Sequence, residues 1–359
     1  MSMTMHALQK TKQPLNFFTE SVIDFNAVNF WLQKFNPLWS SNQALAKVVH
    51  KEFAAEDMVS LTLQVNRHFK LGQAGQHHPV FITVNGVRYE RTYSLTQLDR
   101  QHVLLSVKKV EAGKVSTWLA EQAKEGDILE FGIPFGDMTV PADKPLVLLA
   151  AGSGITPMFS LLKSLSKNNQ LKAQPIQLMY WVKRHEDAAF KADFEKWAEL
   201  NSNFSFHIFY TQEAEHDARL NETHAAEIKN LTESTVFACG PSGFSAKAED
   251  LFAQTAQVFK SEAFSMSLAQ TDDIGFVNVT LTQSNKVISI PKGQSILVSL
   301  EQQNIKPTHG CRMGICNKCV CNKAEGATKN LLNGAQNSEP GNALKICVNS
   351  AQSDLVIDL

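Results

Sequence analysis

Five of the six cysteines lie between positions 311 and 347, and their spacing constrains this chain more than any other feature. Cys311, Cys316 and Cys319 are separated by four residues and then by two, and Cys347 follows 28 positions later. Three thiolates this close together can all point inward only from a tight loop, and neighbouring glycines permit that curvature. The fourth thiolate then comes from a separate strand. Because disulfides are rare inside cells, such crowding in a chain without a secretion signal indicates a metal site.

The spacing matches that of plant-type [2Fe–2S] sites, in which three clustered cysteines are followed by a distant fourth. A structural zinc site is the less favoured alternative, because zinc sites usually show two close cysteine pairs. We therefore expect the iron ligands to be Cys311, Cys316, Cys319 and Cys347. Cys321, the fifth cysteine of the region, fits a small buried hydrophobe better than a ligand.

The rest of the sequence divides according to the period of its apolar residues. The N-terminal part repeats them at helical spacing, at Phe18, Val22, Phe25, Val28, Leu32 and Phe35. The next part alternates them as in antiparallel strands, and a third part alternates apolar strands with helices, which predicts a parallel sheet covered on both faces. We expect five parts: an amphipathic extension (residues 1–45), an antiparallel β-barrel (46–142), an α/β domain (143–266), a polar linker (267–275) and an α+β cysteine domain (276–359).

Composition narrows the class of protein. Apolar residues make up 43% of the chain and charged residues 19%, which is typical of a globular protein and not of a disordered one. The net charge of -1 argues against a nucleic-acid partner. The longest apolar stretch, residues 145–162, is interrupted by Gly152 and Pro157 and does not fit a membrane span. We expect a cytoplasmic protein without a transmembrane segment.

Two motifs in the barrel segment contain residues suited to a phosphate-bearing ring compound. The first ends a predicted strand, whose alternation puts Arg91 and Tyr93 on one face and Thr92 and Ser94 on the other. Taken alone, it is ordinary strand surface and core. The second motif lies at the start of a predicted helix, where backbone N–H groups can bind phosphate. The simpler interpretation is that its serine only caps the helix. This motif consists of Gly113, Lys114, Val115 and Ser116.

Two further motifs follow predicted strands of the α/β segment. An apolar strand over residues 146–150 runs into a turn that opens a helix, the context of a nucleotide phosphate site. The turn contains Gly152, Ser153, Gly154, Ile155, Thr156 and Pro157, with proline where the dinucleotide fingerprint has its last glycine. A later strand ends at Cys239, Gly240 and Pro241, at the edge where ligands of open α/β sheets bind.

The order of these motifs resembles the ferredoxin–NADP reductase superfamily. Residues 46–359 are similar, more narrowly, to three-part reductases with a plant-type ferredoxin domain at the C-terminus. Within the extension, the run Asn36, Pro37, Leu38 and Trp39 resembles reductases that serve membrane-bound di-iron fatty-acyl (stearoyl-CoA) desaturases. The resemblance implies a flavin-binding barrel, a parallel-sheet NAD(P)-binding domain and a β-grasp [2Fe–2S] domain.

The resemblance also implies roles for the residues that match its motifs. Arg91, Thr92 and the run from Gly113 to Ser116 hold the flavin pyrophosphate, Tyr93 packs on the flavin ring, and the Ser94 hydroxyl reaches flavin N5. The turn from Gly152 to Pro157, with Gly240 and Pro241, cradles the nicotinamide nucleotide. The implied catalytic residues are Ser94, Thr156 and Cys239.

Three cofactors follow, because a nicotinamide gives up two electrons together, a [2Fe–2S] cluster accepts one, and a flavin can mediate between them. In this family the motif pair favours FAD over FMN. Lys183 and Arg184 follow the second strand of the sheet, where a basic side chain can bind the 2′-phosphate of NADPH. Glu186 and Asp187 come directly after, so an ordinary solvated turn, and hence NADH, stays open.

The acceptor of the electrons is predicted from the extension alone. A reductase for a membrane di-iron desaturase, acting at the inner face of the membrane through its partner, is the leading hypothesis. The alternatives are the reductase of a soluble Rieske-type or ring-hydroxylating oxygenase, and a non-catalytic redox sensor. The aromatic face of the extension either contacts the acceptor or membrane or packs on its own domain. Asn317 and Lys318 depart from the family pattern and leave the exposure and potential of the cysteine loop open.

Overall fold

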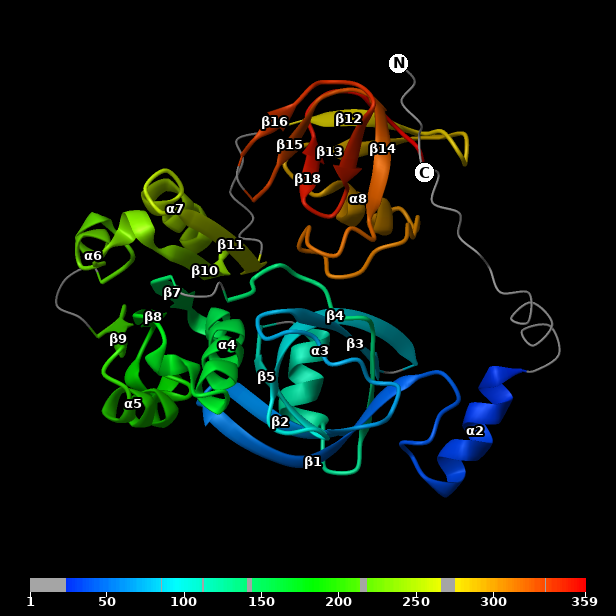
Figure 1. Ribbon diagram of the computed structural model, residues 1–359. Helices are drawn as coiled ribbons and strands as arrows, with labels where there is room; N and C mark the ends of the chain where they lie inside the picture. The colour runs from blue at the N-terminus through cyan, green and yellow to red at the C-terminus, as the bar shows by residue number, and fades with distance from the viewer. Residues whose placement is uncertain are drawn as a thin grey trace, which may run out of the picture.

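The computed structural model describes residues 24–359, apart from 85, 112, 141–143, 214–217, 266–274 and 333. Phe18, Val22 and nearly all of the predicted linker lie outside these residues. The described chain forms a barrel, an α/β domain beside it, and a cysteine domain above the barrel (Figure 1). Among the described helices, none is long and apolar enough to cross a membrane.

A short helix precedes the barrel. Helix α2 (Phe25–Phe35) begins after Asp24, whose carboxylate accepts from the backbone N–H of Asn26 at 2.9 Å. It lies on the side of the barrel away from the α/β domain (Figure 1). Asn29 is buried and accepts from the N–H and hydroxyl of Ser41, both at 2.8 Å. A polar network therefore holds α2, and the predicted apolar face is not buried as a unit, since Phe35 is 80% exposed.

The barrel is closed, antiparallel and six-stranded, in the order β1-β2-β5-β4-β3-β6. Alternate residues fill its interior, including Leu61, Leu63 and Leu105, as their two-residue period predicts. A short helix, α3 (Lys114–Thr117), continues into a π-helical turn that buries Leu119 in this interior. The strands are β1 (Ala44–Ala55), β2 (Met58–Val65), β3 (His77–Val84), β4 (Val87–Gln97), β5 (His102–Lys108) and β6 (Ile128–Phe131).

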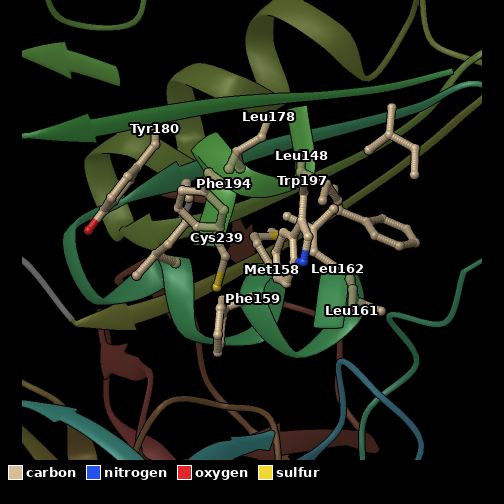
Figure 2. Close-up of a cluster of buried hydrophobic side chains, with 14 of the residues drawn as sticks. Leu148, Met158, Phe159, Leu161, Leu162, Leu178, Tyr180, Phe194, Trp197 and Cys239 are labelled. Atoms are coloured by element: carbon tan, nitrogen blue, oxygen red, sulfur yellow. The ribbon is translucent and has the colours of Figure 1, made fainter. Parts of the chain in front are cut away.

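The α/β domain contains a five-stranded parallel sheet in the order β11-β10-β7-β8-β9. Its central strand β7 is buried at all six positions, and its side chains alternate between two apolar clusters on opposite faces. Figure 2 shows the larger cluster, in which Met158 and Phe159 of α4 pack on the sheet. The strands are β7 (Leu146–Ala151), β8 (Ile176–Val182), β9 (Phe204–Tyr210), β10 (Thr235–Pro241) and β11 (Val258–Ser265). The helices are α4 (Ile155–Lys167), α5 (Lys191–Leu200), α6 (Glu222–Ala226) and α7 (Ser242–Phe252).

The cysteine domain is α+β, as predicted. Its main sheet has the order β13-β12-β19-β14-β17, with β12 and β19 parallel, and a second sheet has the order β16-β15-β18. Helix α8 (Ile296–Gln302) buries Ile296, Leu297 and Leu300 in the same apolar cluster as the main sheet. The strands are β12 (Phe276–Leu281), β13 (Lys286–Pro291), β14 (Val320–Glu325), β15 (Thr328–Asn330), β16 (Gln336–Asn337), β17 (Asn342–Lys345), β18 (Asn349–Ala351) and β19 (Leu355–Ile357).

Candidate functional site

One cavity of about 510 Å³ brings the motifs of all three domains together. The strand β4 and helix α3 form its barrel side, the turn after β7 and the end of β11 form a second side, and the cysteine loop closes a third. We call it the central cavity. Its lining includes Tyr89, Arg91, Thr92, Tyr93, Ser94, Gly113, Lys114, Val115, Ser116, Ser153, Thr156, Phe264, Cys311, Arg312 and Met313.

The barrel side of the central cavity has the polar and aromatic groups that a flavin needs. Burial raises the pKa of Tyr93 and, together with the nearby Arg312 charge, lowers that of Arg91. Thr92 Oγ1 and Arg312 Nε are buried with no hydrogen-bond partner among the described residues. Since buried polar groups are normally paired, these two atoms fit a cavity that a polar ring compound fills.

The second barrel motif has a geometry that requires glycine. Gly113 is the N-cap of α3, so Ser116 is not the cap residue itself. A Cβ at Gly113 would lie 2.4 Å from Ser116 Oγ and 2.9 Å from Val110 O. The Ser116 hydroxyl donates to Gly113 O at 3.3 Å and accepts from the N–H of Val110 at 3.2 Å. The loop before α3 is thereby fixed against the cavity.

A second cavity, of about 680 Å³, opens at the carboxyl ends of β7, β8 and β10. We call it the nucleotide cavity. Gly152 adopts a φ of 54° there, and a Cβ at Gly154 would lie 1.9 Å from Cys239 O, so the turn packs directly on the backbone of β10. Thr156 donates to Ser153 O at 3.1 Å. Basic side chains line this cavity from several elements: Lys108, Lys183, Arg219 and Lys247.

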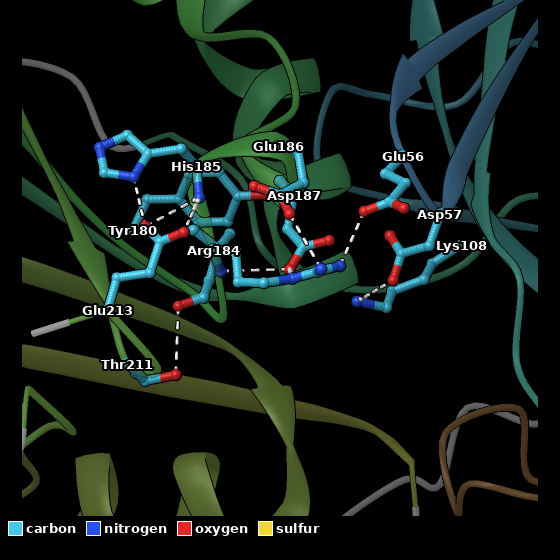
Figure 3. Close-up of polar contacts among 11 residues, drawn as sticks. Glu56, Asp57, Lys108, Tyr180, Arg184, His185, Glu186, Asp187, Thr211 and Glu213 are labelled. Atoms are coloured by element: carbon cyan, nitrogen blue, oxygen red, sulfur yellow. Dashed lines mark hydrogen bonds and ion pairs between the residues drawn. The ribbon is translucent and has the colours of Figure 1, made fainter.

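Six residues predicted to bind the nucleotide or act in catalysis do not line either cavity: Gly154, Ile155, Pro157, Arg184, Cys239 and Gly240. Cys239 is fully buried within the apolar cluster of Figure 2, and burial raises the pKa of its thiol well above the ordinary value. Arg184 turns toward the barrel, where it pairs with Glu56 at 2.7 Å and also with Glu186 (Figure 3). Of the two basic residues after β8, therefore, only Lys183 is among the described residues lining the nucleotide cavity.

Four thiols form two pairs, three of them in the cysteine loop (residues 309–319) and the fourth, Cys347, between β17 and β18. Cys319 Sγ lies 3.0 Å from Cys347 Sγ, and the backbone N–H groups of Cys311 and Cys316 each lie 3.3 Å from the other's sulfur. The hydrogen bond from Cys311 lowers the pKa of Cys316 to about 5. Two thiol pairs fit the two irons of a [2Fe–2S] cluster.

The cysteine loop is also fixed to the barrel. The Lys318 ammonium pairs with the Glu90 carboxylate at 2.7 Å and lies over the ring of Phe81, 5.5 Å from its centroid. On the other side of the loop, Arg312 donates to Glu301 at 2.9 Å and lies 2.8 Å from His309. These contacts place Cys311 at the wall of the central cavity.

Comparison with known proteins matches each domain separately. Residues 45–140 match the oxidoreductase FAD-binding domain family, residues 148–250 the oxidoreductase NAD-binding domain family, and residues 279–348 the 2Fe-2S iron-sulfur cluster binding domain family. The three occur in the order that the sequence predicts.

This chain is a three-domain oxidoreductase similar to the ferredoxin–NADP reductase superfamily.

Individual relatives span nearly the whole reductase. An NADPH oxidoreductase of Mycobacterium tuberculosis is 27% identical, over 92% of this chain and 88% of its own. Phthalate dioxygenase reductase of Burkholderia cepacia is 26% identical, over 87% of this chain and 96% of its own. A solved structure of phthalate dioxygenase reductase superposes with a TM-score of 0.63 and 25% identity, covering 88% of this chain and 97% of its own. The reductase is therefore an NAD(P)H-dependent flavin and iron–sulfur oxidoreductase that uses FAD and a [2Fe–2S] cluster.

Sequence reasoning missed Phe264, whose ring lines both cavities, and two buried residues behind the wall of the central cavity. His77 on β3 hydrogen-bonds Ser94, and Glu262 on β11 contacts His77. No motif marked them, and β11 itself was not predicted as a strand. The run of two histidines at positions 77 and 78, inside an otherwise apolar strand, was the one available signal.

Proposed function

We propose that this reductase passes electrons from NADPH through FAD and its own [2Fe–2S] cluster to an oxygen-activating protein. The observation that carries the proposal is the central cavity, whose wall contains Ser94 of the barrel, Thr156 of the nucleotide domain and Cys311 of the cluster loop. Bound FAD there supplies the conversion of a hydride into single electrons. Because the flavin and its two reaction partners share one cavity, positioning is the main contribution of the protein.

Within this proposal, each lining residue has a part. Arg91, Lys114 and the backbone around Gly113 hold the flavin phosphates, and Tyr93 packs on the ring. The turn from Gly152 to Thr156 and Pro241 hold the nicotinamide nucleotide. Cys239 acts from beneath this turn, through the backbone contact with Gly154, since its side chain is buried. Cys311 and Cys316 bind one iron, and Cys319 and Cys347 bind the other.

For the acceptor we propose a membrane-bound di-iron fatty-acyl desaturase. The supporting observation is the exposed aromatic surface of α2, where Phe30 is 56%, Trp31 64% and Phe35 80% exposed. Exposed aromatic side chains gathered on one short helix suit a membrane or protein interface. The names of the relatives favour the second candidate, the terminal oxygenase of a ring-hydroxylating system.

Purified reductase added with NADPH to desaturase-containing vesicles is expected to support acyl-chain desaturation. The triple variant Phe30→Ser, Trp31→Ser, Phe35→Ser should lower that rate about tenfold, because losing a few buried apolar contacts costs more than 1.4 kcal/mol of binding. Reduction of soluble cytochrome c should not change. Phe53→Ser, which alters an exposed aromatic residue of the barrel, is the control. Turnover with a ring-hydroxylating oxygenase but not with the desaturase would reverse the assignment of the acceptor.

We also propose that NADPH is preferred, with Lys183 binding its 2′-phosphate. Lys183→Ala should raise the KM for NADPH about tenfold and leave the KM for NADH unchanged, because a charge-assisted hydrogen bond contributes roughly 1.5–3 kcal/mol. Arg184→Ala is the matched control: its guanidinium is bound to Glu56 and Glu186, so the KM for both nucleotides should stay the same. Equal KM changes for NADPH and NADH in Lys183→Ala would contradict the assignment.

A further inference from the structure

Helix α2 packs on the barrel with its polar side. Asn29 is buried and donates to Asn42 Oδ1 at 2.9 Å, and Gln33 donates to Gln43 Oε1 at 3.0 Å. Because Asn29 and Gln33 are four residues apart, they lie on one face of the helix. A surface helix normally does the opposite and turns its apolar side to the core. Side-chain hydrogen bonds therefore hold this face of α2 to the barrel.

The face of α2 turned away from the barrel is aromatic. Phe30, Trp31 and Phe35 are each more than half exposed, and so is Trp39 just beyond the helix. The rings of Phe30 and Trp31 pack edge to face, with centroids 5.5 Å apart. An inverted helix of this kind is unfavourable in water, and exposed apolar side chains gathered in one place mark a site of interaction.

The charges around this aromatic face are positive. Residues 25–40 contain no Asp or Glu, and their one charged residue is Lys34, whose ammonium lies 5.2 Å from the centroid of the Phe30 ring. Arg67 and Trp39 line the same groove, of about 480 Å³, whose other lining residues include Leu32 and Leu38. A cation beside an apolar groove fits an amphiphile with a negative headgroup.

We propose that α2 lies in the surface of an anionic phospholipid bilayer, with its aromatic side chains among the headgroups and Lys34 and Arg67 against the lipid phosphates. The 11 residues of α2 make a helix about 16 Å long, which suits a helix lying in the plane of the membrane. The proposal deepens the proposed function and rests on it for the use of lipid binding, which is to bring the cluster near a membrane-bound acceptor.

A bilayer accounts for this face better than a second copy of the chain does. A contact between two α2 faces would bring Lys34 and Arg67 of both molecules together, and residues 25–40 offer no carboxylate to pair with them. In a bilayer, by contrast, Trp side chains concentrate at the level of the headgroups, where the ring is apolar and its N–H stays near water. Each Lys or Arg close to an anionic surface adds to the binding.

Sedimentation with protein-free lipid vesicles tests the proposal on the cofactor-loaded full chain. The parent protein should bind vesicles that contain phosphatidylglycerol. The triple variant Phe30→Ser, Trp31→Ser, Phe35→Ser should lower the partition coefficient at least about tenfold, because the lost apolar contacts exceed the 1.4 kcal/mol that a tenfold change requires. Phe53→Ser, on strand β1, is the control and should bind as the parent does. Reduction of cytochrome c by NADPH shows that each variant is folded.

A second pair of variants tests the cations. Lys34→Gln combined with Arg67→Gln should lower binding to phosphatidylglycerol vesicles about tenfold and leave binding to pure phosphatidylcholine unchanged. The matched control, Lys172→Gln combined with Lys196→Gln, removes two exposed charges of the α/β domain, which lies on the other side of the barrel from α2 (Figure 1). Raised salt should act like the Lys34 and Arg67 changes, because it screens charges and leaves aromatic insertion intact.

Four results would overturn the proposal. One is a parent protein that binds neither kind of vesicle, and another is a triple serine variant that binds as well as the parent. A dimer that forms in the parent and is lost in the serine variant would assign this face to a second copy. Binding only to vesicles that contain the desaturase would assign it to a protein partner. Because the test vesicles contain no acceptor, a wrong choice of acceptor changes none of the expected lipid binding.

Discussion

Replacing Cys347 by serine is expected to remove the iron–sulfur cluster and to lower electron delivery to cytochrome c by at least about a hundredfold. Cys347 is 1% exposed, and its sulfur lies 3.0 Å from that of Cys319, so no other described thiol can take its place. Without a one-electron centre beside the flavin, only direct flavin oxidation remains. NADPH-driven reduction of ferricyanide should therefore persist in this variant.

Cys321→Ala is the matched control for the cysteine experiment. Cys321 lies on β14, two residues after a ligand, and packs in the apolar cluster of the same domain. Its replacement should cost about 1 kcal/mol of stability and leave the cluster in place. Iron and sulfide content, together with the electron paramagnetic resonance signal of the reduced protein, measure the outcome. A full cluster in Cys347→Ser, or its loss in Cys321→Ala, would show that the ligand set is wrong.

Substituting Gly154 by alanine is expected to abolish nucleotide-driven reduction while both bound cofactors remain. The added Cβ would lie 1.9 Å from Cys239 O, 2.4 Å from its carbonyl carbon and 2.8 Å from Gly240 N. All three are backbone atoms, which cannot move aside as a flexible side chain can. The turn therefore has to move away from β10, and the shape of the nucleotide cavity changes. We expect kcat/KM for NADPH to fall at least about a hundredfold, because small displacements of positioning groups cost that much.

The control for Gly154 is another glycine of the same region. Gly243 lines the nucleotide cavity, whereas Gly154 lies just behind its wall, and a Cβ at Gly243 meets nothing within 4 Å. Gly243→Ala should therefore keep the kinetics of the parent protein. Flavin and iron content show whether each variant is folded, and dithionite reduction shows whether the flavin still accepts electrons. Normal NADPH turnover in Gly154→Ala would mean that this turn does not bind the nucleotide.

The parts of the fold that sequence predicted best are those that local packing determines. The strand predicted over residues 146–150 forms as β7 (Leu146–Ala151), because apolar runs between turns identify strands inside an α/β domain. Strand β11 was missed, since it lies at the sheet edge and carries Lys260 and Glu262 among its apolar residues. An edge strand of mixed polarity gives a weak periodic signal.

The site shows the same division between local and distant information. Arg91, Ser94, Thr156 and Cys311, which local motifs marked, line one cavity, and each belongs to a loop or strand end whose geometry is set by its neighbours. Glu262, which contacts His77, lies 185 residues away in the sequence and in another domain. Glu56, which pairs with Arg184, lies 128 residues away. Domain packing decides such contacts, and no local period predicts them.

The ion pair between Lys318 and Glu90 bears on how electrons leave the cluster. Lys318 is 40% exposed, and pairs of this kind contribute about 0–1 kcal/mol, too little to hold two separate proteins together. Here both charges belong to one polypeptide, so the covalent connection raises their effective concentration above that of two separate proteins. An ion pair this weak forms and breaks easily. We therefore expect the cysteine domain to turn away from the flavin once its cluster is reduced and to present that cluster to the acceptor protein.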